Sequence, residues 1–426
     1  MKNKKLLVLG GKPVCSYEII KYAKSKGVYT IVTDYLPVNK SRAKQIADEV
    51  WNISTDNVDE LERLCIKNKV DAVFAGVHEF NLEKAMELCE RLRIPFYSTR
   101  EQWDFGTDKG KFKKMCKKYG LPVPRDYDYT KIDDENISYP IIVKPVDGSS
   151  GRGISICYNK DDLDIAYQVA MDHSLKKQVI VEELIEGEEI VAFYTIKDSD
   201  IRLSVLSDYY YNHEQEVTMP LPQVYIYPSK HINKYVTEVN DSAISMINAL
   251  GIKQGTFFLQ AFINDKGFFF FEPGFRPGGS SVYKYTKYFN NISYLEMLVD
   301  YALTGNMDSH DLNLENPYFP RPCCTVSLVS KGGEVGEIKG LEEVISAKEI
   351  LDYEKRYDVG DIIAKKSALG QIHLRFFIVA NDFNNLVEVI NKIQNTIEVL
   401  DVDGNNMLIT KFNTKRLKGY KWQNYL

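Results

Sequence analysis

The chain has 426 residues and a formal net charge of −5, a length that predicts two to four domains or one large enzyme built from several lobes. The mild acidity argues against a nucleic-acid-binding protein, which would carry a basic stripe, and no apolar stretch is long enough for a membrane span. Seven scattered cysteines without a CxxC pair favour reduced thiols and a cytoplasmic location over a disulfide framework or a zinc site.

Strands and helices alternate over the first hundred residues. We expect strands at 4–11, 29–34, 70–76 and 95–98, and helices at 16–27, 57–69 and 81–94. Ser16 is the expected N-cap of the first helix, and Gly27 is its expected stop. The alternation predicts a parallel sheet with helices on both faces, similar to a Rossmann-like domain, over residues 1–105. The first turn, GGKPVC, lacks the GxGxxG spacing, so we do not expect dinucleotide binding there.

The pattern changes after Thr107. A basic amphipathic helix is followed by short strands at 139–145, 153–158, 179–187, 190–196 and 201–211. These predict an antiparallel or mixed sheet with interspersed helices for residues 106–317, with a nucleotide-binding flap and lobe at about 125–190. Strands at 323–330 and 371–380 and a helix at 383–397 predict a small α+β domain for residues 318–426. The expected fold is therefore a multidomain α/β and α+β protein.

The stretch YPIIVKPVDGSSGRG, residues 139–153, ends an apolar strand at Lys144 and continues into a glycine-rich loop. The loop contains Gly148, Ser149, Ser150 and Gly151 and leads into another strand. Such a hairpin flap can bring backbone N–H groups close to a phosphate. Lys144 and Lys109, at the start of the preceding helix, would supply cations. An ordinary hairpin turn and a solvated helix lysine are the alternatives, and the loop has neither the Walker nor the protein-kinase pattern.

The segment VIVEELIEGEEI, residues 179–190, can line an adenine slot. Glu182 and backbone groups would meet the purine edge, Leu184 would pack on the ring, and Glu189 would reach the ribose hydroxyls. Glu183 and Ile185 belong to the same predicted nucleotide-binding segment. A strand followed by a solvated acidic turn is the alternative interpretation.

A third segment, residues 255–279, contains two strands joined by a DKG turn. Gln260 and Glu272 lie on either side of the turn and are predicted cross-strand neighbours. Their oxygen atoms suit Mg²⁺ held together with substrate phosphates. Arg276 follows and would stabilise charge on a transferring phosphoryl group or an acyl oxyanion. Alternatively, the polar residues face solvent and Arg276 pairs with Glu272.

The order and spacing of these segments resemble the ATP-grasp superfamily. The matching elements are TDK at Lys109, IIVKP at Lys144, GSSGRG, EELIEGEE, FLQ at Gln260 and FEPGFRPGG at Glu272. The resemblance covers most of the chain and is closest to proteins similar to the carbamoyl-phosphate synthase large subunit and biotin carboxylase. It implies ATP with Mg²⁺ or Mn²⁺, and an ADP-forming carboxylate–amine ligase that works through an acyl phosphate. It also implies that Lys144 and Arg276 are catalytic, and related folds include homodimers.

One position departs from the family pattern. The usual metal motif reads Glu-x-Asn-x-Arg, whereas this chain has Gly274 at the asparagine position. Gly274 suggests a non-catalytic nucleotide-binding protein as one alternative, and an enzyme that activates bicarbonate is a second alternative that stays open. If the metal is limiting, a Gly274→Asn variant is expected to raise metal affinity or turnover.

The substrate-binding residues are less clearly marked. Gly278, Gly279 and Ser280 offer hydrogen-bond donors next to Arg276. His78 and Glu79 follow a strand of the first domain, where open α/β sheets bind ligands, although a helix cap or loop role is the alternative. The expected partners are a small carboxylate and a small amine, with neither nucleic acid nor membrane.

Overall fold

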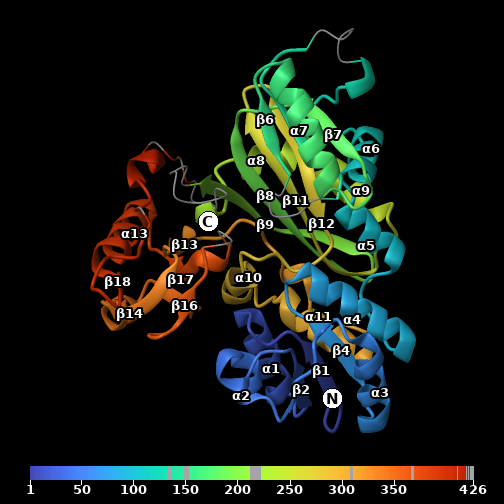
Figure 1. Ribbon diagram of the computed structural model, residues 1–426, viewed down its shortest axis with the longest axis vertical. Coiled ribbons are helices and arrows are strands. Elements are labelled where there is room, and N and C mark those ends of the chain that lie inside the picture. The colour runs from blue at the N-terminus through green and yellow to red at the C-terminus, as the bar shows by residue number, and fades with distance from the viewer. Residues whose placement is uncertain are drawn as a thin grey trace.

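The computed structural model describes residues 1–131, 137–147, 153–211, 222–307, 310–365, 369–409, 411–418, 420 and 422. In Figure 1 the N-terminal part (residues 1–99) lies below the central part (residues 100–317). The C-terminal part (residues 318–422) lies to one side of both. Among these residues, no helix has both the length and the apolar character needed to cross a bilayer. All seven cysteines are buried free thiols, as the sequence predicts.

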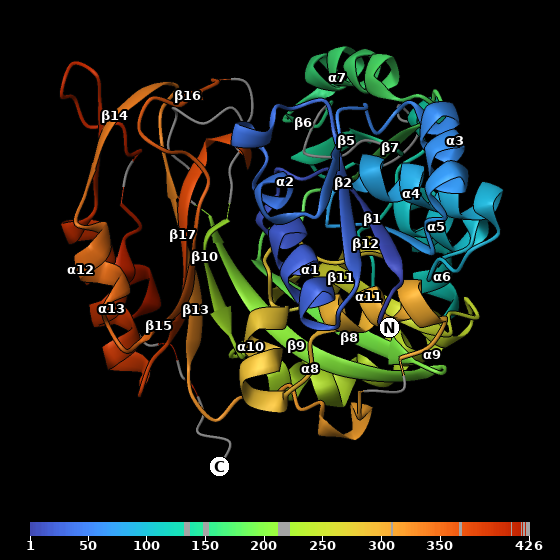
Figure 2. The same cartoon turned by 90° about the horizontal axis from the view of Figure 1, so that it is seen from below.

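The N-terminal part contains a four-stranded parallel sheet in the order β3-β2-β1-β4. Its elements are β1 (Lys5–Leu9), α1 (Val14–Ser25), β2 (Tyr29–Thr33), α2 (Arg42–Ile46), β3 (Glu49–Trp51), α3 (Val58–Asn68), β4 (Ala72–Ala75) and α4 (Glu79–Leu92). Figures 1 and 2 show α1 and α2 on one side of the strands and α3 and α4 on the other. The predicted parallel sheet with helices on both faces is confirmed.

Two local predictions in this part are wrong. Helix α1 begins at Val14 after Pro13, so Ser16 lies within the first turn, where its hydroxyl donates to the Gly10 carbonyl at 2.6 Å. Residues 95–98 form no strand. Instead Tyr97 is buried against Phe275 of the central part, and its hydroxyl donates to the Phe275 carbonyl at 3.3 Å.

The central part is organised around an eight-stranded antiparallel sheet in the order β12-β11-β8-β9-β10-β13-β17-β15. The strands are β8 (Glu188–Lys197), β9 (Asp200–Tyr211), β10 (Pro222–Tyr227), β11 (Gln254–Asn264), β12 (Gly267–Gly274), β13 (Cys323–Val329), β15 (Ile350–Lys355) and β17 (Ile372–Val379). The accompanying helices are α5 (Arg100–Thr107), α6 (Lys109–Lys118), α8 (Ile232–Glu238), α9 (Asn240–Asn248), α10 (Tyr283–Asn290) and α11 (Tyr294–Thr304). The sheet is continuous across residue 318, and the division at 105 and 317 stays a prediction.

A small three-stranded sheet in the order β6-β5-β7 projects from the central part. It consists of β5 (Ile141–Pro145), β6 (Ser155–Cys157) and β7 (Val179–Glu183), with α7 (Lys160–His173) packed on one face. The buried face contains Ile141, Val143, Cys157 and Val181 and contacts the apolar side of α7. This lobe therefore has a small apolar core of its own, and the opposite face of its sheet is turned away from α7.

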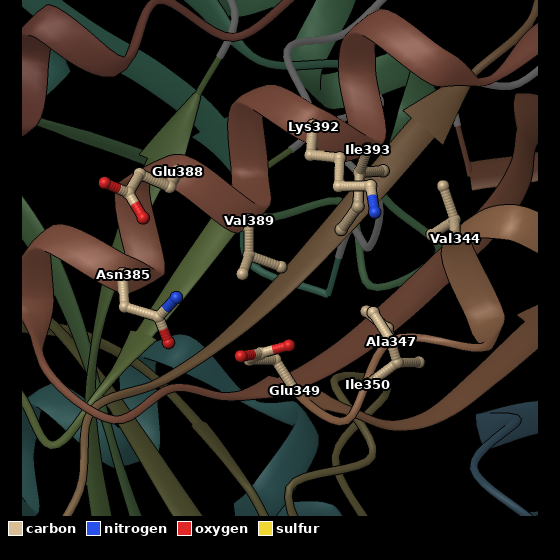
Figure 3. A pocket seen from close by; sticks show the side chains of 9 residues that line it. All are labelled: Val344, Ala347, Glu349, Ile350, Asn385, Glu388, Val389, Lys392 and Ile393. Atoms are coloured by element: carbon tan, nitrogen blue, oxygen red, sulfur yellow. The ribbon is translucent and has the colours of Figure 1, made fainter.

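The C-terminal part adds β14 (Gly333–Lys339), α12 (Leu341–Ile345), β16 (Ile362–Ile363), α13 (Phe383–Thr396) and β18 (Glu398–Asp401) to β13, β15 and β17. Its core is a second apolar cluster beneath α13. A cavity of about 270 Å³ lies between α12, α13 and the start of β15 (Figure 3). Another of about 470 Å³ lies between α1, α10 and α11. Of the predicted site residues that the structure describes, none lines either cavity.

Burial of His373 on β17 predicts a pH-dependent stability. The ring is fully buried between the Ser330 hydroxyl and the Tyr357 carbonyl, both at 3.1 Å, and burial lowers its pKa from 6.5 to about 4. Between these values the unfolded chain binds the extra proton, so stability falls as the pH falls. The free energy of unfolding is expected to drop by about 3 kcal/mol between pH 6.5 and pH 4 from this group. In urea unfolding, the free energy of unfolding of His373→Gln should depend less on pH than that of the wild type. The same pH dependence in both proteins would show that His373 is not the group responsible.

Candidate active site

Lys109 and Glu272 meet beneath the lobe formed by β5, β6 and β7. Asp108 caps helix α6, and its carboxylate accepts the Lys111 backbone N–H at 3.0 Å, which places Lys109 in the first turn. The Lys109 Nζ lies 3.8 Å from Glu272 Oε2 on β12. The structure thus joins two residues that are 163 positions apart, the predicted phosphate-binding lysine and the predicted metal-binding carboxylate.

Lys144 lies on β5 and is hydrogen-bonded to Glu182 on the paired strand β7. Lys113 of α6 donates to the other Glu182 oxygen at 2.7 Å and also pairs with Asp126. All three side chains that meet at Glu182 are almost completely buried. Lys117 pairs with Asp126 as well, so three lysines meet two carboxylates and the cluster retains one positive charge, which suits a bound anion.

Lys113 is a residue that the sequence analysis missed. In the sequence it is one of several lysines in a basic amphipathic helix, the usual pattern of a solvated face. Its spacing of four residues from Lys109 is the signal that places both on one side of α6.

The predicted flap residues Gly148, Ser149, Ser150 and Gly151 lie outside the described residues. The strands that flank them are described and pair antiparallel, with Val143 opposite Ser155. The antiparallel pairing of the two flanking strands agrees with the predicted hairpin. The phosphate-binding role of the loop stays a prediction.

The face of the lobe that carries Lys144 and Glu182 also carries apolar side chains. Ile142 pairs with Glu182 on one side and with Ile156 on the other, so all three lie on the same face. Ile156 is 45% exposed and Ile154 is 40% exposed. Exposed isoleucines beside buried lysines suit a flat aromatic base joined to phosphates. In the sequence, the alternation of Ile154 and Ile156 in GISIC indicates that both side chains lie on one face of the strand.

The remaining residues of the predicted nucleotide segment follow β7. Glu183 is half-buried, and its carboxylate accepts the Arg125 backbone N–H at 3.0 Å. Leu184 and Ile185 are half-buried in the connection to β8. These residues lie where the small lobe joins the large sheet, and their contact with a nucleotide stays a prediction.

Gln260 and Glu272 are direct cross-strand partners on β11 and β12, as predicted. The Gln260 amide donates to Glu189 Oε1 at 3.0 Å, and the Tyr211 hydroxyl donates to Glu189 Oε2 at 2.6 Å. Burial raises the pKa of Glu189 to about 7, against the two hydrogen bonds that lower it. Glu189, predicted at the ribose, therefore lies beside the predicted metal pair.

The donor set fits one Mg²⁺ ion that shares its coordination with phosphate oxygens. The Gln260 nitrogen is engaged by Glu189, which leaves its carbonyl oxygen to join the Glu272 carboxylate. Within the described part of the chain, no three His, Cys, Asp or Glu side chains converge as metal ligands. A cation here would thus rely on the nucleotide for most of its ligands.

A Glu272→Gln substitution is expected to weaken Mn²⁺ binding about tenfold when ADP is present, because it removes a charged ligand. Electron paramagnetic resonance of free Mn²⁺ measures this without any turnover. Asp265→Asn, which removes an exposed carboxylate at the turn of the same hairpin, is the matched control and should leave the affinity unchanged. Equal affinities in the wild type and Glu272→Gln would exclude Glu272 as a ligand.

Arg276 joins the end of β12 to the N-terminal part. Its Nε donates to Glu79 Oε1 at 3.0 Å, and its Nη1 donates to the Pro277 carbonyl at 3.1 Å. Glu79 is the first residue of α4, and His78 precedes it as an exposed N-cap residue without a side-chain cap bond. The structure therefore brings His78, Glu79 and Arg276 together at the carboxyl end of β4. Arg276 pairs with Glu79 and not with Glu272.

The glycine-serine segment after Arg276 is held by residues of the C-terminal part. Gly278 and Ser280 are buried and Gly279 is exposed. Arg375 of β17 donates to the Gly279 carbonyl at 2.7 Å, and Glu354 of β15 accepts the Ser281 hydroxyl at 3.1 Å. Sequence analysis missed both charged residues. The available signal in the sequence was a charged Arg375 within the run LRFFIV, whose other residues are all apolar; the structure shows the whole strand to be buried.

Comparison with known proteins agrees with this geometry. Residues 137–280 match the family model described as an ATP-grasp domain. The carbamoyl phosphate synthase large chain of Clostridium perfringens (strain SM101 / Type A) is 24% identical over an alignment of 275 residues, which covers 59% of this chain and 26% of that protein. The chain therefore spans about a quarter of the length of this relative.

Two solved structures share the fold over nearly the whole chain. Phosphoribosylglycinamide synthetase from Anaerococcus prevotii has a TM-score of 0.73 at 19% identity and covers 93% of this chain and 99% of its own. L-amino acid ligase from Bacillus licheniformis has a TM-score of 0.75 at 18% identity, and the match covers 94% of this chain and 99% of the ligase chain. The predicted ATP-grasp fold is confirmed.

Proposed function

Because the chain carries an ATP-grasp domain, we propose that it is an ADP-forming ligase that joins a small carboxylate to a small amine. The observation that carries the proposal is that Glu272 lies next to two predicted site residues, Lys109 from α6 and Gln260 from the neighbouring strand. A phosphate-binding cation and a metal-binding carboxylate are the two parts that a site for a magnesium–nucleotide needs. The charged cluster at Lys144 supplies a second phosphate contact.

In the first step, a carboxylate oxygen of the substrate attacks the γ-phosphorus of ATP. The bond to the β–γ bridging oxygen breaks, and the products are an acyl phosphate and ADP. Lys109 and Lys144 hold the phosphates in line, and Arg276 neutralises charge on the transferring group. Mg²⁺ held by Gln260 and Glu272 would neutralise further phosphate charge.

In the second step, the amine nitrogen attacks the acyl carbon and displaces inorganic phosphate, while the amine proton passes to solvent. The chain's contribution to this step is again positional. Gly278, Gly279 and Ser280 lie next to Arg276 and can hold the acyl group through backbone N–H donors. Closure of the small lobe would exclude water, which otherwise hydrolyses the acyl phosphate.

ADP release from MgATP, measured against pools of amino acids and small carboxylic acids, tests this proposal. ADP release that requires one acid and one amine, and that is lost in Lys144→Ala, is the expected result. Release with bicarbonate alone would favour a bicarbonate-activating enzyme. Tight nucleotide binding without release under any pool would favour a nucleotide-binding protein and reject the ligase.

A further inference from the structure

Gly274 has no room for a side chain. It faces Phe258 across the β11–β12 pair, and a Cβ atom at Gly274 would lie 2.1 Å from Phe258 Cζ and 2.3 Å from Cε1. These separations are far below any van der Waals contact. The space of the missing asparagine is therefore filled by an aromatic ring from the neighbouring strand.

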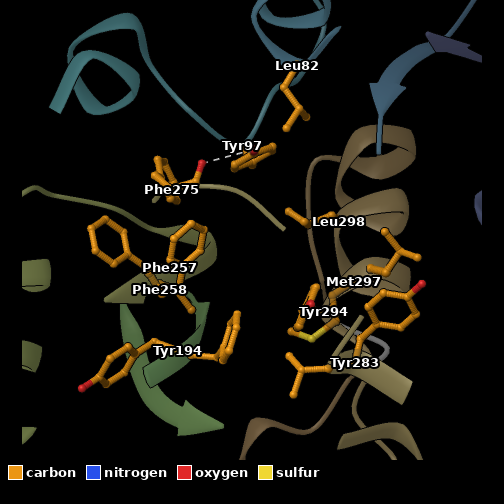
Figure 4. Packing of buried hydrophobic residues seen from close by; sticks show 14 of the residues in the cluster. Leu82, Tyr97, Tyr194, Phe257, Phe258, Phe275, Tyr283, Tyr294, Met297 and Leu298 are labelled. Atoms are coloured by element: carbon orange, nitrogen blue, oxygen red, sulfur yellow. Dashed lines mark hydrogen bonds between the residues drawn. The ribbon is translucent and has the colours of Figure 1, made fainter. Parts of the chain in front are cut away.

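Phe258 lies on the same face of β11 as Gln260, because the two residues are separated by one position. This face carries the predicted metal pair at Gln260 and Glu272. The ring is 7% exposed and belongs to the aromatic core drawn in Figure 4. Phe258 thus extends that core to the edge of the candidate site.

The guanidinium carbon of Arg276 lies 5.1 Å from the centre of the Phe258 ring. This distance is within the range of a cation–π interaction. A second ring, Phe193 of β8, lies 6.0 Å from Phe258 and fills the space beside Gly278, where a Cβ would come within 2.5 Å of Phe193 Cε1. The segment from Gly274 to Gly278 therefore packs against the rings of Phe258 and Phe193.

We propose that Phe258 is a positioning residue for Arg276, with its ring supporting the guanidinium from the space that a side chain at position 274 would occupy. The role of Arg276 in this inference rests on the proposed function. Gly274 is then required for the ring to fit, and the lack of a metal-ligating side chain at position 274 is the consequence. The residue types at the two positions depend on each other, because a phenylalanine ring at 258 leaves space only for glycine at 274.

The geometry changes the expectation for Gly274→Asn. The asparagine collides with Phe258, so this variant should lose thermal stability and should not gain metal affinity. In a Phe258→Ala background the same asparagine has space, and its effect on Tm should largely disappear. An equal loss of Tm in both backgrounds would overturn the steric half of the proposal.

The reactivity of Arg276 tests the positioning half without any turnover. Phenylglyoxal modifies exposed arginines, and mass spectrometry gives the rate at each one. Phe258→Leu keeps an apolar side chain but removes the ring, so Arg276 should react about two- to fivefold faster. Phe270→Leu is the matched control, because Phe270 is a buried ring of the same hairpin that packs against Tyr235 and not Arg276.

An unchanged Arg276 rate in Phe258→Leu would overturn the positioning role, as would an equal rise in Phe270→Leu. Both readouts remain valid if the protein proves to have no ligase activity, so failure of this inference and failure of the proposed function are distinguishable. Where ADP release is measurable, Phe258→Leu should lower kcat and leave the KM for ATP unchanged. A rise in KM with unchanged kcat would contradict a role through Arg276.

Discussion

Replacement of Lys144 by methionine is expected to lower kcat/KM for ATP by about 10³-fold. The substitution removes a cation from the face that is proposed to receive the phosphates, and a charge-stabilising contact in a buried site contributes about this much. Glu182 also loses the lysine at one of its two oxygens. The free energy of unfolding should therefore fall by about 3 kcal/mol, the usual result of breaking a buried ion pair.

Lys113→Met separates the two effects of that substitution. Lys113 is bonded to the other oxygen of the same buried Glu182, so its loss should lower stability by a similar amount. Lys113 comes from α6 and not from the strand that leads into the glycine loop, so its loss should lower kcat/KM for ATP far less. Equal kinetic losses in both variants would show that Lys144 acts only through the stability of the lobe.

Replacement of Arg276 by methionine is expected to lower kcat by about 10²- to 10³-fold with little change in the KM for ATP. The physical reason is that a guanidinium which meets developing charge contributes mainly in the transition state. Lysine should restore little of this activity, because it lacks the planar fork and the stacking surface that face Phe258. Initial rates of ADP release measure both variants.

Glu79→Gln is the matched control for Arg276. The Arg276–Glu79 ion pair is partly exposed, so it should contribute less than about 1 kcal/mol to stability. If Arg276 acts on the substrate, Glu79→Gln should retain most of the activity. A loss as large as that of Arg276→Met would show that the reaction needs Glu79 as well, through the ion pair or through its own predicted contact with the substrate, and would contradict a role of the arginine alone.

The strands that carry the candidate site were predictable from local patterns. The DKG turn between two aromatic strands predicted the hairpin, and a β-bulge beside Gln260, which leaves Phe271 without a direct partner, brings Glu272 opposite Gln260. The apolar run before Lys144 and the glycines after it predicted the hairpin of β5 and β6. Both results depend on residues close together in the chain, where turn chemistry and alternation are informative.

Contacts between distant segments were not predictable in the same way. Arg375 reaches Gly279 across 96 positions, and Lys113 reaches Glu182 across 69. No local pattern specifies such pairs, since a buried lysine and a solvated one have the same neighbours in an amphipathic helix. The wrong strand at 95–98 has the same origin, because the packing of Tyr97 against Phe275 decides its conformation.

Gly274 shows how a departure from a family pattern gains a physical explanation from the structure. In the sequence it is a missing metal ligand and suggests weaker catalysis. In the structure it is the space for the Phe258 ring. The proposed metal site therefore consists of Glu272, Gln260 and the phosphates of the nucleotide.

The measurement that tests the central claim most directly follows the oxygen atoms of the carboxylate. The protein is incubated with MgATP, the amine and the carboxylate identified by ADP release, with the carboxyl group labelled with ¹⁸O. An acyl phosphate leaves one carboxylate oxygen on the phosphate that the amine displaces, so each released phosphate should carry one ¹⁸O atom. Release of ADP with unlabelled phosphate would contradict a carboxylate–amine ligase.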